Sequence, residues 1–324
     1  MTATVAPSVA EKIAAYERTR RKGVAFLLTN VKADGEVSRG FPRVTFYRVP
    51  WALAVSGETA AAHRVLTWIE RHGLGADGEF HGGVTWTREA NRAFNTYPET
   101  CLAYGAHLLR RFDLARRLMD FAARYQDPET GGIFMDRWRT GADDPQLIFL
   151  TAQFGMSAVI TGRLEQARKT GGWFRRLWQA QPGLPERLYC VWTRAGGLAT
   201  TVPAGENVRH YVNESQEIEQ YHYNGGIAAA FLAHLFMATG DPEWLDLARA
   251  YQRVSIASTP RQFEVKQVCK SAWGSGLITL ATGDDAYRDW LIRMGDWFAA
   301  EQEADGRWSN SRYRAPPPPL TPRI

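Results

Sequence analysis

The chain has 324 residues, of which 45% are hydrophobic, and a formal net charge of +5. It can therefore bury a large core, and its charge suits an anionic small-molecule substrate. No stretch approaches the roughly 20 apolar residues of a membrane span, and residues 1–23 contain no apolar run typical of a signal peptide. We therefore expect a cytoplasmic protein with no stable membrane insertion. The arginines are dispersed and no nucleic-acid motif occurs, which argues against a nucleic-acid partner.

Three cysteines, Cys101, Cys190 and Cys269, lie far apart in the sequence. They lack the spacing of a zinc site or a disulfide framework, so we expect them to be reduced and buried. No metal and no cofactor is expected. A homodimer is compatible with the sequence.

A repeated pair of helices organises most of the chain. Residues 9–29 predict a single helix, and from about residue 44 an apolar helix, a short turn and an amphipathic helix alternate. The apolar helices are expected at 45–57, 95–111, 144–162, 216–240 and 266–283. Their partners, in which apolar residues follow the i, i+3, i+4, i+7 pattern of a helix with one buried face, are expected at 58–74, 113–126, 163–178, 241–254 and 284–302.

The joints between the helices support this division. The tripeptides SGE, TGR and TGD place a glycine where the end of a helix needs left-handed backbone. Only 186–203 is expected to hold a short strand hairpin, and the proline-rich residues 309–324 are expected to form a tail. The sequence thus predicts one all-α domain, an α/α toroid of five to six hairpins with a buried inner ring and an amphipathic outer ring. Residues 1–43 would form its N-terminal helix and lead-in loop. An open solenoid is the alternative.

A second motif follows several amphipathic helices, as ADGEF (76–80), QDPETGGIF (126–134) and QEADGRW (302–308). The last resembles the Q…DG…W repeat of the squalene-cyclase-like superfamily, which contains the terpenoid cyclases and protein prenyltransferases. The resemblance implies a toroid in which the Gln caps a helix, the Asp-Gly forms a tight turn and the Trp stacks on the next unit. The chain lacks the DxDD motif of protonating cyclases, and neither ADDPQ (142–146) nor GDDAY (283–287) fits DDxxD. Similar helical pairs ending in TGD occur in unsaturated glucuronyl hydrolases and sugar 2-epimerases.

Residues 213–226 form the most polar start of any apolar helix. In a helix starting at 216, Glu217, Tyr221 and Asn224 would share one face, at i, i+4 and i+7. A carboxyl group buried beside an imidazole or a phenol has a raised pKa and is a usable acid or base. We therefore expect Glu217 to be the catalytic acid/base, with His222 and Tyr221 tuning or relaying the proton. A capped helix start with a solvated charge cluster is the alternative.

Other polar and aromatic residues precede or begin the apolar helices. Lys266 and Lys270 lie one helical turn apart at a helix start, where the helix dipole opposes a cation, so we expect a compensating anion there, either Glu264 or a ligand. Arg48 is a further expected anion contact. The remaining predicted substrate contacts are Tyr47, Trp51, His81, Trp86, Tyr97, Asp136, Trp138, Gln146, Tyr223, Asn224 and Trp273.

The leading hypothesis is a cofactor-independent cyclase or isomerase of secondary metabolism, with acid/base chemistry in an aromatic-lined central cavity. The alternative is a carbohydrate-active hydrolase, lyase or epimerase, in which Arg48, Lys266 and Lys270 hold the carboxylate of an acidic sugar. A third hypothesis is a non-catalytic binding scaffold.

Overall fold

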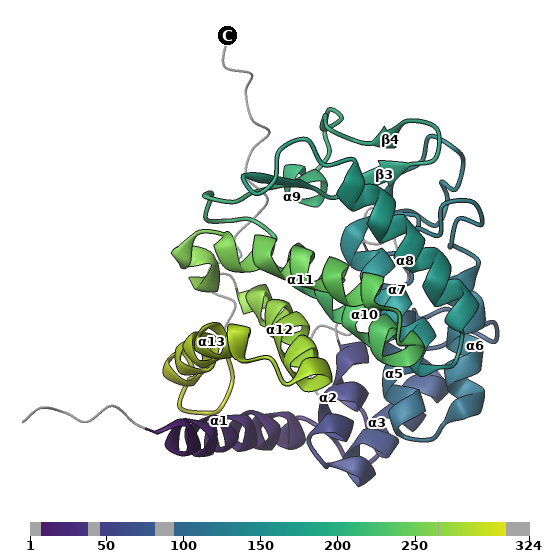
Figure 1. Ribbon diagram of the computed structural model, residues 1–324. Coiled ribbons are helices and arrows are strands. Elements are labelled where there is room, and N and C mark those ends of the chain that lie inside the picture. The colour runs from purple at the N-terminus through teal and green to yellow at the C-terminus, as the bar shows by residue number, and fades with distance from the viewer. Residues whose placement is uncertain (1–7, 38–45, 82–93, 265, 309–324) are drawn as a thin grey trace, which may run out of the picture.

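The computed structural model describes residues 8–37, 46–81, 94–264 and 266–308, and its helices form two layers around a common axis (Figure 1). The predicted contact Trp86 and the predicted tail at 309–324 lie outside these residues. No helix within the described ranges is both long and apolar enough to cross a lipid bilayer.

In the described parts of the chain, five helices form the inner layer, and each packs against the next along the sequence. They are α2 (Val49–Val55, preceded by the 3-10 helix η1, Phe46–Arg48), α5 (Tyr97–Leu108), α7 (Ile148–Ile160), α10 (Tyr223–Thr239) and α12 (Cys269–Thr282, preceded by η2, Pro260–Glu264, and η3, Lys266–Val268). They are the five predicted apolar helices. Small residues bring them close together: a Cβ atom on Gly226 of α10 would lie 2.3 Å from the Cα of Ser271 in α12.

The amphipathic helices form the outer layer: α3 (Thr59–His72), α6 (Phe112–Ala123), α8 (Leu164–Gln179), α11 (Pro242–Ala257) and α13 (Arg288–Ala300, preceded by η4, Asp285–Tyr287). Their buried residues follow the predicted helical periodicity, as at Leu114, Leu118 and Phe121 in α6. The predicted division into buried and one-sided helices is confirmed.

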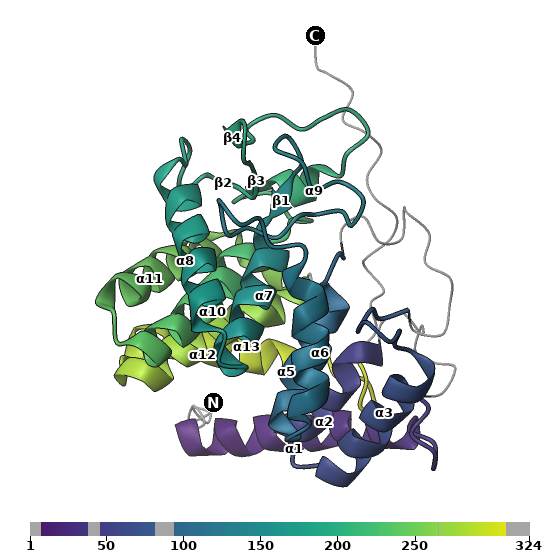
Figure 2. The ribbon, with the colours of Figure 1, turned by 90° about the vertical axis from the view of Figure 1, so that its right-hand side faces the viewer.

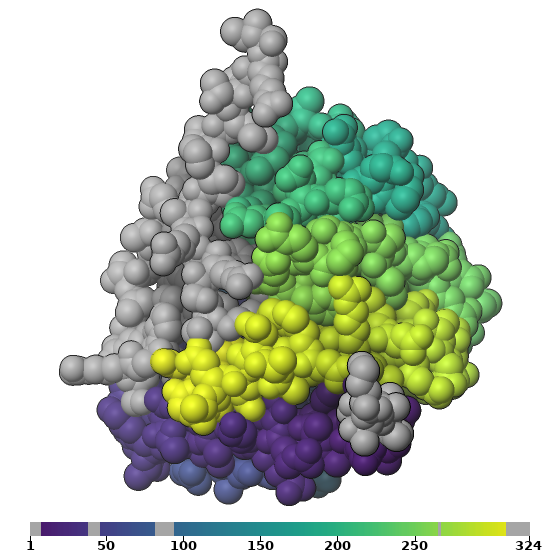
Figure 3. All heavy atoms as spheres, turned by 90° about the vertical axis from the view of Figure 1, so that its left-hand side faces the viewer, coloured from purple at the N-terminus to yellow at the C-terminus, as the bar shows by residue number. Residues whose placement is uncertain are grey.

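The N-terminal helix α1 (Val9–Thr29) lies beside the last helix of the chain. The Tyr16 hydroxyl donates to the carbonyl of Ile292 at 2.9 Å, and Lys12 pairs with Asp296 at 2.6 Å. Figure 3 shows the C-terminal segment, in yellow, against α1, in purple. Helix α1 thus completes the outer layer, and the predicted toroid, rather than the open solenoid, is the fold.

The Q…DG…W turn joins neighbouring outer helices. Gln302, after α13, donates through Nε2 to the carbonyl of Thr19 in α1 at 2.9 Å and to that of Gly306 at 2.8 Å. Gly306 has φ +95°, and Trp308 packs against Gly23 of α1. Gln126 repeats the arrangement after α6, where Nε2 donates to the carbonyl of Gln166 in α8 at 3.1 Å. The expected structural meaning of this motif is confirmed.

Short strands and one short helix gather at one end of the toroid (Figure 2). Strands β1 (Gln146–Leu147), β3 (Val191–Thr193) and β4 (Gly197–Leu198) form an antiparallel sheet in the order β1-β3-β4. Strands β2 (Arg187–Tyr189) and β5 (Val212–Glu214) pair antiparallel, and α9 (Val208–Tyr211) precedes β5. The hairpin expected within 186–203 is confirmed as β3–β4, whereas the sequence pattern does not predict the pairing of β2 with β5.

The prediction that all three cysteines are buried is wrong in part. Cys101 and Cys190 are buried as expected, but Cys269 is exposed. It is the first residue of α12, where the helix leaves the preceding 3-10 turn.

Candidate active site

The first turns of the inner helices meet around the axis of the toroid. Their residues there are Tyr47 and Arg48 before α2, Tyr97 in α5, Phe149 in α7, Tyr223 in α10 and Lys270 in α12, and we call these six residues the central site. Five of the six, all except Phe149, are substrate contacts predicted from the sequence.

Contacts between these side chains run from helix to helix. Ring centroids are 6.2 Å apart for Tyr47 and Tyr97, 5.5 Å for Tyr97 and Phe149, and 6.4 Å for Phe149 and Tyr223. Cations lie at both ends of this aromatic series. The guanidinium of Arg48 is 5.2 Å from the Tyr97 centroid, and Nζ of Lys270 is 4.0 Å from the Tyr223 centroid.

Neither cation has a carboxylate within ion-pair distance in the described part of the chain. Lys270 is 7% exposed, and burial, with the charge of Arg48 adding to it, lowers its pKa to about 8. Arg48 is solvent-exposed. Burial has the largest single effect on its pKa and lowers it, but the neighbouring Tyr47 and Tyr97, with smaller contributions from other groups, outweigh burial and raise the pKa above its usual value. Two neighbouring cations without carboxylate partners among the described residues favour an anionic ligand.

A second layer of rings lies along the inner helices beyond the central site. Trp51 stacks on Tyr104 with centroids 4.2 Å apart, and lies 5.3 Å from Trp273. The Tyr104 hydroxyl is 3.5 Å from Nε2 of His234. Burial raises the pKa of Tyr104 and lowers that of His234, so this layer is aromatic and neutral.

A histidine that the sequence pattern does not indicate lies beside the aromatic series. His210 of α9 has its ring 6.3 Å from Phe149 and 5.5 Å from Tyr221, which in turn lies 5.3 Å from Tyr223. Burial, with a smaller effect from Arg209, lowers the pKa of His210 to about 4, and its Nδ1 has no hydrogen-bond partner among the described residues. His210 is therefore neutral near pH 7 and can accept a proton, but its pKa of about 4 makes it a weak base.

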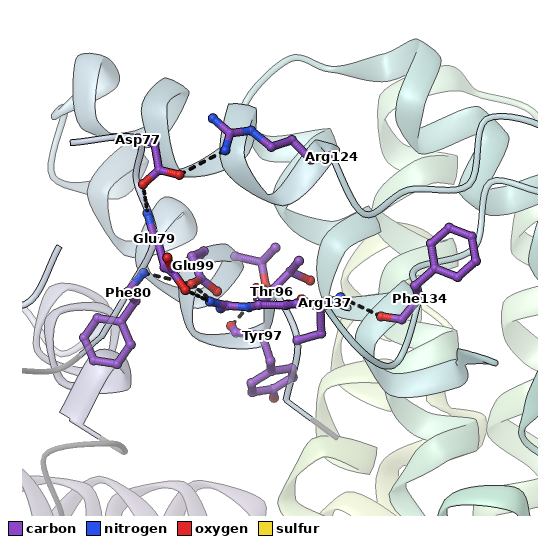
Figure 4. Close-up of polar contacts among 11 residues, drawn as sticks. Asp77, Glu79, Phe80, Thr96, Tyr97, Glu99, Arg124, Phe134 and Arg137 are labelled. Carbon is purple, nitrogen blue, oxygen red and sulfur yellow. Dashed lines mark hydrogen bonds and ion pairs between the residues drawn. The ribbon is translucent and has the colours of Figure 1, made fainter. Parts of the chain in front are cut away.

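A buried ion-pair cluster fixes the start of α5 (Figure 4). Arg137, whose side chain is 4% exposed, pairs with Glu79 and, at 2.7 Å, with the fully buried Glu99. Its Nε donates to Asn95, which itself donates to the carbonyl of Phe134. Arg137 thereby joins the turn after α3, the start of α5 and the loop before β1. This cluster positions Tyr97, which is two residues from Glu99.

The catalytic roles predicted within 213–226 assumed a helix that starts at 216, and the structure has a different geometry there. Helix α10 begins at Tyr223 rather than at 216, because 212–214 is a strand and the link to the helix is irregular. Glu217 is exposed, so the expected buried carboxyl group is absent from this position. His222 is buried, but its Nε2 lies 2.8 Å from the backbone carbonyl of Glu217 rather than from a carboxylate. Tyr221, also of the predicted trio, contacts the central site, with its ring centroid 5.3 Å from that of Tyr223.

Two other predicted substrate contacts lie in the protein interior and bond to neighbouring side chains. Gln146 and Asn224 are fully buried: Gln146 bonds to Asp127, Thr130 and Trp173, and Asn224 lies against Cys190 and Asn213. Both side chains contact other residues of the protein interior, and a ligand contact at either of them stays a prediction.

Asp136, Trp138 and His81 also lie in loops outside the central site. Asp136 is buried and accepts from the backbone of Trp138, whose own ring is 53% exposed. The backbone of His81 donates to the carbonyl of Gly73, in the turn after α3. Lys266 lies in η3, one turn before Lys270.

Some of the residues absent from the predicted site had a usable signal. Cys101 and Tyr104 follow Tyr97 at i+4 and i+7, so they share its helical face. Phe149 lies in an uninterrupted apolar run, and only the fold selects its inward face. No group of three or more metal-ligating side chains occurs in the residues described.

No protein-family model matches the chain, and no curated protein matches it in sequence. Solved structures do match it. A D-mannose isomerase aligns with a TM-score of 0.65 and 10% identity, covering 94% of this chain and 90% of that one. A family 76 α-mannanase of Bacteroides thetaiotaomicron aligns with a TM-score of 0.60 and 13% identity, covering 93% of this chain and 89% of that one. The type II terpene cyclase MstE of Scytonema, solved with geranylgeranyl dihydroxybenzoate, aligns with a TM-score of 0.57 and 14% identity. The alignment covers 93% of this chain and 82% of that one. At these identities the likeness shows the α/α toroid fold, which three different kinds of enzyme share.

Proposed function

We propose that the protein is a cofactor-independent isomerase that moves a proton on an acidic sugar or a similar polyhydroxylated carboxylic acid. The observation that carries this proposal is the pair of cations, Arg48 and Lys270, that face the aromatic central site without carboxylate partners among the described residues. The similarity of fold to a D-mannose isomerase and an α-mannanase is consistent with a sugar-like ligand.

Each part of the site has a role in this proposal. Arg48 and Lys270 hold the carboxylate, since a guanidinium and an ammonium are the natural partners of an anion. The rings of Tyr97, Phe149 and Tyr223 pack on the apolar face of the sugar. His210, neutral at physiological pH, removes the proton from the carbon next to the carbonyl group, and the electron pair of that C–H bond forms an enediolate. The protonated His210 then returns the proton to carbon, which completes the isomerisation.

Solvent exchange tests this function across a small panel of acidic sugars. In D2O, the wild-type protein incubated with D-glucuronate, D-mannuronate or D-galacturonate should incorporate deuterium beside the carbonyl of at least one of them, as followed by proton NMR. We expect Arg48→Met to weaken binding of that sugar by roughly 10- to 100-fold. Arg175→Met removes the same charge from the outer helix α8 and should leave binding unchanged. If none of the acidic sugars binds, the proposal fails.

The catalytic base is a separate question. His210→Gln should abolish exchange while the sugar still binds. The assignment of this role to Glu217 stays a prediction, and Glu217→Gln tests it in the same assay. If Glu217→Gln abolishes exchange and His210→Gln does not, the base is Glu217.

A cyclase is the second candidate, favoured by the aromatic layer of Trp51, Tyr104 and Trp273 and by the similarity of fold to MstE. Rings stabilise carbocations, but two nearby cations destabilise them, so we rank this function lower. Conversion of geranylgeranyl dihydroxybenzoate to a cyclised product, detected by mass spectrometry and NMR, would establish it in place of the isomerase.

A further inference from the structure

The surroundings of Lys270 are unusual for a lysine. The side chain is almost fully buried, lies in the second residue of α12 and directs Nζ at the face of Tyr223. The titratable groups around it are Arg48 from η1, Cys101 from α5, Cys269 from α12 and Tyr223 from α10, and none of these is a carboxylate. No partner in this set fixes the amine in its charged form.

A lysine in such surroundings is a nucleophile as well as a cation. Burial and the neighbouring Arg48 both favour the neutral amine, whose lone pair is free to react. Arg48 lies in the same site and would then hold the carboxylate alone, so this inference replaces the carboxylate contact given to Lys270 above with a role at the carbonyl group. An anionic molecule held by Arg48 would thus present its carbonyl group to an amine rather than to a second fixed charge.

We propose that Lys270 is a catalytic residue that forms an imine with the open-chain carbonyl of an acidic sugar or keto acid anchored by Arg48. This inference rests on the proposed function and specifies its chemistry. The Nζ lone pair forms the C–N bond and the carbonyl π electrons move to oxygen. The oxygen then leaves as water, with one proton from the amine and one from solvent, which leaves a protonated imine. The positive nitrogen acidifies the adjacent C–H bond, whose proton His210 removes. The electron pair of that C–H bond forms an enamine, and the protonated His210 returns the proton to the same carbon, which regenerates the protonated imine. Hydrolysis by water then restores the amine and the carbonyl.

Reductive trapping tests the imine directly. The intact protein is incubated with D-glucuronate and, separately, with glyoxylate in the presence of cyanoborohydride, and the modified lysines are mapped by peptide mass spectrometry. We expect one dominant adduct, on Lys270. Lys32, whose side chain is 53% exposed, serves as the internal reference in the same sample. Equal or greater labelling of Lys32 at neutral pH would overturn the proposal.

The pH profile adds a readout that a merely accessible lysine would not give. With a pKa of about 8, labelling of Lys270 relative to ordinary exposed lysines, whose pKa is roughly 10.4, should be greatest near neutral pH and should decline once the pH passes about 8. Lys270→Arg keeps the charge but should abolish the dominant adduct. Circular dichroism checks its fold, and if that variant does not fold, the pH profile of the wild-type protein decides.

Binding of D-gluconate, which has the carboxylate but no carbonyl, separates the two proposals. Gluconate binding without a Lys270 adduct would overturn the imine and leave the anion site in place. A Lys270 adduct with glyoxylate but no binding of gluconate or of any acidic sugar would support the imine and overturn the acidic-sugar function. Absence of both would overturn both.

Discussion

Trp51 of α2 and Trp273 of α12 lie with their ring centroids 5.3 Å apart and so connect the first and last helices of the inner ring. Other neighbouring inner helices approach closely at glycines, as α10 and α12 do at Gly226. Closure between α2 and α12 depends instead on these two large rings, and Tyr104 of α5 stacks on the same Trp51.

Replacing Trp273 with alanine should therefore destabilise the protein. Loss of a large, half-buried ring contact typically costs about 2–4 kcal/mol of unfolding free energy. Urea unfolding followed by circular dichroism would measure the change. Trp138→Ala is the matched control, since that ring is 53% exposed and should change stability by less than about 0.5 kcal/mol. Equal effects for the two variants would show that the tryptophan contact does not close the ring.

The outer ring closes through Gln302, which gives a second prediction. Gln302→Ala removes two hydrogen bonds, to Thr19 and Gly306, and should cost about 1–2 kcal/mol. Hydrogen exchange should also become faster in α1. Arg307→Ala, five residues further on, removes surface ion pairs with Glu303 and Asp305 and should cost less than about 1 kcal/mol. Faster exchange in α1 with Arg307→Ala but not with Gln302→Ala would contradict this interpretation.

The helical hairpins could be predicted from sequence because helical periodicity is local. Positions i, i+3, i+4 and i+7 describe α6 or α13 without reference to the rest of the chain. The start of α10 could not be predicted in this way, since it depends on the pairing of 187–189 with 212–214, two segments far apart in sequence. The helical spacing of Glu217 and Tyr221 is coincidental, because those residues precede the helix.

The candidate site was predictable to the extent that it lies at helix starts. Arg48 and Lys270 stand out in sequence as cations within apolar segments, and the structure places both in the central site. His210 does not stand out, because it lies in a short helix between strands and approaches Phe149 only through the folding of the strand region. Periodicity carries no information about such contacts.

His210 should make the protein sensitive to acid. Its pKa is about 4 in the folded protein against 6.5 for an unperturbed histidine, so the unfolded chain binds the proton more tightly. Stability therefore decreases as the pH falls from about 6.5 toward about 4, by at most roughly 3 kcal/mol, and this effect is absent above that range. Urea unfolding should show that the free energy of unfolding differs less between about pH 7.5 and about pH 5 for His210→Gln than for the wild type. The exposed His72, replaced in the same way, should leave the difference unchanged. A wild-type pH dependence retained in His210→Gln would contradict the buried, neutral histidine.

The buried pair of Arg137 and Glu99 gives the last prediction. Burial already raises the pKa of Glu99 above 4.5, and Arg137 opposes that shift. Arg137→Met would leave the carboxylate buried without its partner, which typically costs about 3–5 kcal/mol. The folded-state pKa of Glu99 should then rise further, so the deficit is small at low pH, where the carboxyl group is protonated in both states, and grows as the pH rises above about 4.5. Glu99→Gln in the same chain should remove the pH-dependent part of the deficit, since no charge remains to be buried. A deficit in Arg137→Met that is constant between about pH 5 and about pH 8 would show instead that Arg137 acts through packing against Phe121, whose ring lies 5.1 Å from its guanidinium.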